Sequence, residues 1–146
     1  MTQNTRLAPN VFELLFDVAN GVSISEGDII CLNSGGYAEP AVDSAALVCG
    51  IGDALHAADN SAATASDGDI TIKVGTGRAI LVTVSGAVTN NDIGKVMRAT
   101  SDATKLTVSG AVAGINQVPC GRLLCMDPDG SGKAFVDFRL ITQEDA

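Results

Sequence analysis

The four cysteines are the side chains of this chain best suited to bind a metal or to form a disulfide. Structural zinc sites generally draw their thiolates from CxxC pairs, and no such pair occurs among Cys31, Cys49, Cys120 and Cys125. Cys31 and Cys49 lie instead in apolar, strand-like runs, where cysteine behaves as a small apolar residue. We therefore predict buried free thiols in preference to a disulfide or a metal site, and we expect Cys120, beside Pro119, to be the most exposed.

The single histidine, His56, is the one imidazole available for acid–base catalysis. The chain has no Gly-x-Ser-x-Gly motif that would place a nucleophilic serine on a sharp turn. Asp67 and Asp69 are closely spaced carboxylates, but they lie in a turn-like segment where aspartates bond to local backbone. We expect a surface or capping role for His56 and no enzymatic activity. A small hydrolase, with His56 beside an acid and a nucleophile in space, is a competing hypothesis.

Two glycine-containing segments resemble parts of ligand-binding loops. The segment from Asp127 to Gly132 opens like a calcium loop, but the twelfth position is Phe138 where a glutamate is required. Its end, Gly132-Lys133, also lacks the first glycine and the Ser or Thr of a phosphate-binding loop. We therefore predict a hairpin turn over 127–132 and a turn or bulge over 75–78, with no metal and no cofactor at either place.

The elements that position these residues are predicted to be strands. Glycines and Asp-Gly pairs divide the chain at regular intervals into short apolar runs, which is typical of an all-β protein. We expect a compact antiparallel β-sandwich or barrel with short hairpins and little helix, in which residues 1–10 form an extended N-terminal arm and residues 11–146 one β-rich domain. The predicted strands are 11–18, 28–33, 36–40, 46–52, 69–74, 78–85, 95–100, 105–109, 120–126 and 134–141.

The clearest hairpin spans residues 91–108. Leu106 and Val108 alternate with polar residues, Thr107 among them, as in a half-buried strand, and the preceding Ser-Asp-Ala-Thr segment is suited to a short turn. Residues 134–141 show the same alternation. The alanine-rich stretch 45–65 is a weak helix candidate that its glycines interrupt, and 57–67 is expected to be a solvated loop or a short helical turn at the surface.

Composition excludes several classes of partner. The formal net charge is −8, and the nine lysines and arginines are scattered singly, which disfavours direct nucleic-acid binding. With no Trp and one Tyr, the chain has few aromatic surfaces on which sugars or bases could stack. No signal peptide and no membrane-spanning segment is apparent, so we expect synthesis in a cytosol and no membrane partner.

The order of strands and glycines from Val22 onward resembles that of the small bacteriophage capsid decoration, or cement, proteins. This resemblance implies a non-enzymatic, β-rich structural protein without cofactors, commonly a homotrimer near threefold positions. Its partner would be the major capsid protein, and it would stabilise the expanded capsid from the outer surface of the virion. The resemblance is carried by the segments 22–32, 36–41, 48–52, 68–74, 92–95, 120–124 and 132–136.

The segment before Val22 supplies the candidate interface. An arm that reaches a neighbouring subunit would bind through apolar side chains, although the simpler interpretation, which the pattern favours, is that 11–16 is the first core strand. An alternative function is that of a receptor- or glycan-binding β-module of a virion surface or tail protein, which should expose aromatic side chains. The candidate interface residues are Leu7, Val11, Phe12, Leu14 and Phe16.

Overall fold

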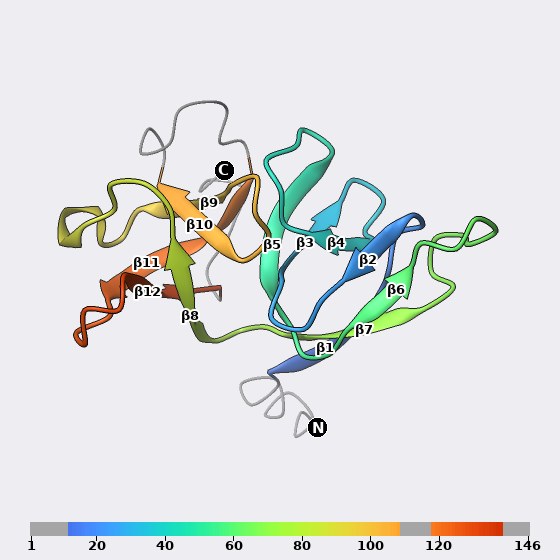
Figure 1. The fold of residues 1–146 in the computed structure, drawn as a ribbon, viewed down its shortest axis with the longest axis horizontal. Coiled ribbons are helices and arrows are strands. Elements are labelled where there is room, and N and C mark those ends of the chain that lie inside the picture. Colours follow the sequence, from blue (N-terminus) through green and yellow to red (C-terminus); the bar gives the residue numbers. More distant parts are fainter. Residues whose placement is uncertain (1–11, 109–117, 139–146) are drawn as a thin grey trace, which may run out of the picture.

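A computed structural model describes residues 12–108 and 118–138 of the chain (Figure 1). These residues form short strands and one turn of 3-10 helix, η2 (Asn90–Asp92), so the predicted all-β class is confirmed. Each strand predicted from the sequence overlaps an observed one, but the observed strands Val22–Ile24 and Ala58–Asn60 were not predicted. The strands are β1 (Glu13–Asp17), β2 (Val22–Ile24), β3 (Ile29–Asn33), β4 (Ala38–Pro40), β5 (Leu47–Ala54), β6 (Ala58–Asn60), β7 (Thr71–Gly75), β8 (Ala79–Val84), β9 (Val96–Ala99), β10 (Lys105–Val108), β11 (Pro119–Met126) and β12 (Lys133–Asp137).

One half of the molecule is a five-stranded antiparallel sheet in the order β1-β7-β5-β3-β4, accompanied by the two-stranded ribbon β2-β6. Ile24 of the ribbon is buried in one cluster with Ile30, Ile72 and Val74 of the sheet. The tight β3–β4 turn forms because Gly36 adopts a positive φ of 85°, while the Asn33 side chain accepts backbone hydrogen bonds within the turn.

The other half is a small closed barrel in the order β10-β8-β12-β11-β9. Its interior is filled by aliphatic side chains, among them Met97, Leu106, Leu123 and Val136, all fully buried. Most of its strand pairs are antiparallel as expected, but β8 and β10 pair in parallel. Closure leaves these strands without open edges, so the exposed edges of the described chain belong to the sheet half.

The two halves meet where β5 contacts β11, and Figure 1 shows β5 near the middle of the molecule, between the barrel strands and the rest of the sheet. Gly50 lies directly against Cys120, so that a Cβ at position 50 would stand 2.8 Å from the Cys120 Cα. Ile29, Cys31 and Leu47 of the sheet half are buried in the barrel cluster. The sheet and the barrel therefore share a continuous apolar core at this joint.

The β9–β10 hairpin has the predicted strands and turn. Asp102 in the turn accepts hydrogen bonds from the backbone N–H and the hydroxyl of Thr104, at 2.9 and 2.7 Å. The predicted half-burial of β10 is wrong at Thr107, which is fully buried beside Leu106 and Val108. Its hydroxyl donates to the Ser85 carbonyl at 2.7 Å, and this bond compensates for the loss of water.

The prediction of a surface loop over 57–67 is wrong for the first part of this segment. Its first part is strand β6, paired with β2, and Asn60 at the end of this strand is buried. The Asn60 Nδ2 group donates to the carbonyls of Val18, Ala19 and Ser66 at 3.0–3.2 Å. One side chain thus fixes both the β1–β2 connection and the loop that follows β6, a contact that the local sequence does not reveal.

Candidate binding surface

A group of exposed apolar side chains lies on β1 and on the residue just before it, at the edge of the sheet. Leu15 is 65% exposed, and Phe12 and Leu14 are each 45% exposed. Phe16 is half-buried and packs against the sheet core, opposite Ile72. Of the candidate interface residues, Phe12 and Leu14 are therefore exposed, Phe16 contributes mainly to the core, and Leu7 and Val11 lie outside the described residues. Sequence reasoning missed Leu15, because alternation along the strand places it on the face opposite to Phe12, Leu14 and Phe16.

The register of β1 against β7 explains this exposure. Leu14 pairs with Val74 on the core side of the sheet, but its edge position leaves it half-covered. Leu15 pairs with Lys73 on the opposite side, where the Lys73 ammonium lies 3.7 Å from the Glu13 carboxylate. Apolar side chains on a sheet edge mark either a partner site or an aggregation hazard. The acidic residues at the two ends of β1, Glu13 and Asp17, restrict which strands are able to pair with β1.

The two edges of the sheet differ in how they are protected. Strand β4 at the far edge carries Pro40, which has no N–H to offer another strand, and Ala38 forms an isolated bridge with Val18. Because Val18 directly follows β1, this bridge also joins the end of β1 to β4; over Glu13–Asp17 itself, none of the described strands pairs with the side that faces away from β7. The apolar side chains of Phe12, Leu14 and Leu15 on this open edge are the candidate binding surface, which we call the β1 edge.

His56 lies in the loop between β5 and β6, beside β7. It is exposed, its Nε2 accepts the backbone N–H of Lys73 at 3.0 Å, and its Nδ1 lies 2.9 Å from the Ala57 carbonyl. This arrangement defines the tautomer with the proton on Nδ1, because Nε2 must be the acceptor. The predicted surface position is confirmed, and both ring nitrogens are engaged with backbone rather than with a nucleophile or an acid.

A cleft of about 250 Å³ separates the sheet from the barrel, lined on one side by Gly27, Ile29 and Asp53 and on the other by residues 80–83 and Thr104. Asp53 is bonded to Arg78 at 2.7 Å. Burial raises the pKa of Asp53, and the neighbouring guanidinium opposes that rise. The carboxylate is thus already paired with a cation, which suits a structural ion pair better than proton transfer.

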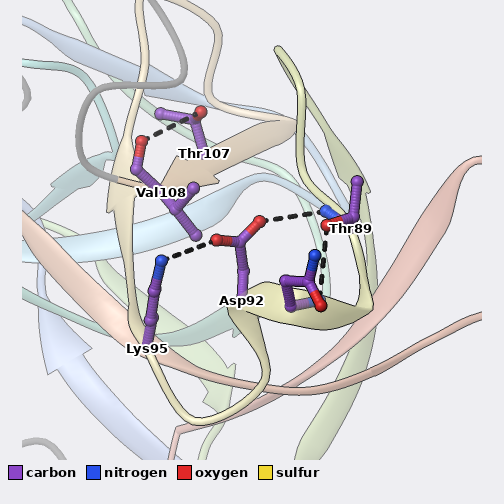
Figure 2. Close-up of polar contacts among 6 residues, drawn as sticks. Thr89, Asp92, Lys95, Thr107 and Val108 are labelled. Atoms are coloured by element: carbon purple, nitrogen blue, oxygen red, sulfur yellow. Dashed lines mark hydrogen bonds and ion pairs between the residues drawn. The ribbon is translucent and has the colours of Figure 1, made fainter.

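A second polar cluster orders the loop between β8 and β9 (Figure 2). Asp92 accepts the Thr89 N–H at 3.0 Å and the Lys95 ammonium at 2.9 Å, while the Thr89 hydroxyl accepts the Asn91 N–H. These bonds, chiefly that from Thr89, lower the pKa of Asp92. The arrangement is the reciprocal capping box that begins a helix, here the single turn of η2. The capping box stabilises the loop, and the Asp92 carboxylate is occupied by these bonds rather than available for proton transfer.

The cysteines are free thiols, as predicted, but their exposure differs from the prediction. Cys31 and Cys120 are buried, Cys49 is half-buried and Cys125 is exposed. The expectation that Cys120 is the most exposed is wrong, because its strand packs on Gly50 at the joint between sheet and barrel. Cys125 is exposed because the β11 register shifts between Leu123 and Cys125 and turns it outward. Within the described residues, no group of His, Cys, Asp and Glu has the arrangement of a metal site.

The segment after β11 forms the predicted hairpin turn. The Asp127 N–H donates to the Lys133 carbonyl at 2.9 Å, and the Asp127 carboxylate accepts the Asp129 N–H at 3.1 Å. The Asp127 side chain is therefore used to close the turn.

Comparison of the chain with protein-family models, with curated proteins and with solved structures finds no match. Within residues 12–108 and 118–138, no helix has the length and apolar character needed to cross a membrane.

Proposed function

We propose that this chain is a capsid decoration protein, which binds the outer surface of an expanded bacteriophage capsid and stabilises it without catalysing a reaction. The observation that carries this proposal is the β1 edge, where Phe12, Leu14 and Leu15 are exposed along a strand whose outer side is paired with none of the described strands. The order of strands and glycines that resembles decoration proteins supports it. So does the engagement of His56, Asp53 and Asp92 in structural bonds.

The physical basis of stabilisation is mass action. A protein that binds the assembled, expanded lattice but not free subunits lowers the free energy of that lattice by its binding free energy at each site. Decoration as a homotrimer near threefold positions, with the major capsid protein as partner, would repeat this gain over the whole shell. In this proposal the β1 edge contacts the major capsid protein by adding a strand and burying its leucines.

The first test is co-sedimentation of the purified chain with expanded capsids from a phage that lacks this protein, with unexpanded shells as the comparison. Saturable binding to expanded shells alone is the expected result, and it gives the copy number per capsid. An absence of binding to both kinds of shell would contradict the proposal and favour the receptor- or glycan-binding alternative, which an array of glycans would then examine.

The second test asks whether the β1 edge is the contact. Replacing Leu14 and Leu15 by threonine keeps β-propensity but removes exposed apolar surface, and we expect the Kd for expanded capsids to rise about tenfold or more, since burial of such side chains contributes about 1–3 kcal/mol each. The matched control replaces Leu81 and Leu124, leucines of 43% and 40% exposure on the barrel, by threonine. Equal losses in both variants would show that β1 is not the contact.

A further inference from the structure

Two buried thiols face each other where the sheet meets the barrel. The Sγ atoms of Cys31 in β3 and Cys120 in β11 are 3.8 Å apart, and both residues are fully buried. The two residues are 89 positions apart in the chain. A bond between these sulfurs would therefore join the two halves of the molecule directly.

Gly50 creates the space for this contact. It pairs with Cys31 across β3 and β5, and its missing side chain leaves room for Cys120, whose sulfur would lie 2.9 Å from a Cβ at position 50. The Cys120 thiol thus sits over the strand next to Cys31. The two sulfurs are close because strands β3, β5 and β11 pack together, and neither cysteine lies in a loop.

We propose that Cys31 and Cys120 are a redox modification site, at which a peroxide converts the two thiols into a disulfide that ties β3 of the sheet to β11 of the barrel. A disulfide has an S–S length of about 2.05 Å, so the two sulfurs must approach by about 1.8 Å, a movement that side-chain rotation and small backbone shifts provide. The proposal is independent of the capsid-binding function.

The reaction balances with hydrogen peroxide as the oxidant. One cysteine, as its thiolate, attacks the O–O bond, which gives a sulfenic acid and, with one proton, releases water. The second thiol then attacks the sulfenic sulfur, the S–O bond breaks, and a second water leaves as the S–S bond forms. Two thiols and one peroxide thus become one disulfide and two waters, with the sulfurs oxidised and the peroxide oxygens reduced.

The environment predicts that this reaction is slow. The hydrogen bond with Cys120 and desolvation raise the pKa of the Cys31 thiol strongly, so that its reactive thiolate is rare. Cys125 is exposed and should react first with added peroxide. The experiment therefore uses a variant without the competing thiols, Cys49→Ser with Cys125→Ser, whose native fold is checked by circular dichroism.

This variant is treated with hydrogen peroxide and examined by intact mass and by thiol titration in denaturant. We expect a monomer that loses two hydrogen atoms and all free thiols, with a melting temperature raised by about 10 °C and restored by a reductant. Adding Cys31→Ala to the same background should abolish both changes. A product that gains oxygen atoms, forms dimers or keeps both thiols would overturn the proposal.

If the double-serine variant does not fold, Cys125→Ser alone serves, with the disulfide located by peptide mapping. A bridge between Cys31 and Cys120 is the expected result. A bridge from Cys49 to either of them would refute the assignment.

Discussion

Replacement of Asn60 by alanine should destabilise the sheet half of the molecule by about 3 kcal/mol. The change removes the Asn60 Nδ2 group, whose two hydrogens are shared among three carbonyls and contribute about 0.5–1.5 kcal/mol each. The carbonyls of Val18 and Ser66 keep a second donor, the N–H groups of Gly68 and Asp69. The Ala19 carbonyl loses the Asn60 donor and gains none, which adds a desolvation penalty of about 1–3 kcal/mol.

The assay is urea unfolding followed by circular dichroism. With a slope of about 2 kcal/mol per M, a loss of 3 kcal/mol moves the midpoint down by about 1.5 M. Asn60→Asp should cost more than Asn60→Ala, because a carboxylate facing carbonyls offers no donor and adds a buried charge. The matched control is Asn20→Ala: Asn20 is an exposed asparagine in the β1–β2 connection that Asn60 contacts, and its backbone bond to Asp67 is retained. A midpoint shift for Asn60→Ala no larger than that of the control would refute this account of the β2–β6 ribbon.

Two further predictions concern the joint and the response to acid. Gly50→Ala should lower the free energy of unfolding by roughly 2 kcal/mol or more, because its Cβ meets the Cys120 backbone, whereas Gly35→Ala meets only the movable Tyr37 and Asn33 side chains and should change the urea midpoint little. Melting temperature should fall as pH drops below about 4, because aspartates whose folded-state pKa is lowered stabilise the fold above their unfolded pKa and lose that contribution as they protonate. Asp53, whose pKa is raised, acts in the opposite direction. In melting curves recorded from pH 7 to pH 3, Asp92→Asn should reduce the fall of the melting temperature at low pH. An unchanged fall would contradict the role given to the Asp92 hydrogen bonds. The aspartates with lowered pKa are Asp59, Asp92, Asp102 and Asp127.

Sequence patterns predicted ten of the twelve described strands, all but β2 and β6, because the signals of those ten are local. Glycine spacing marks the turns. The short apolar run 29–32 and the alternation of apolar and polar residues over 70–74 both favour strands over a helix. The β9–β10 hairpin and the turn at Asp127 were predicted correctly for the same reason, since their polar side chains bond within a few residues.

The errors fall where burial depends on distant partners. Thr107, Asn60 and Cys120 were expected at or near the surface from their neighbours in the sequence, yet each is buried by a contact far along the chain. The parallel pairing of β8 with β10 is likewise set by closure of the barrel. Periodicity reports which side of a strand is apolar, but it does not report what covers the other side.

The acidic residues of β1 limit which partner fits the proposed binding surface. If two copies paired their β1 strands antiparallel over all five residues, centred on Leu15, Glu13 of each copy would face Asp17 of the other. Like charges directly opposite each other destabilise such a pair, so this self-pairing is disfavoured at neutral pH. A trimer, moreover, cannot be closed by a contact that is identical on both subunits. The partner strand that suits this edge is therefore one from a different surface, apolar at its centre and basic or neutral at its ends.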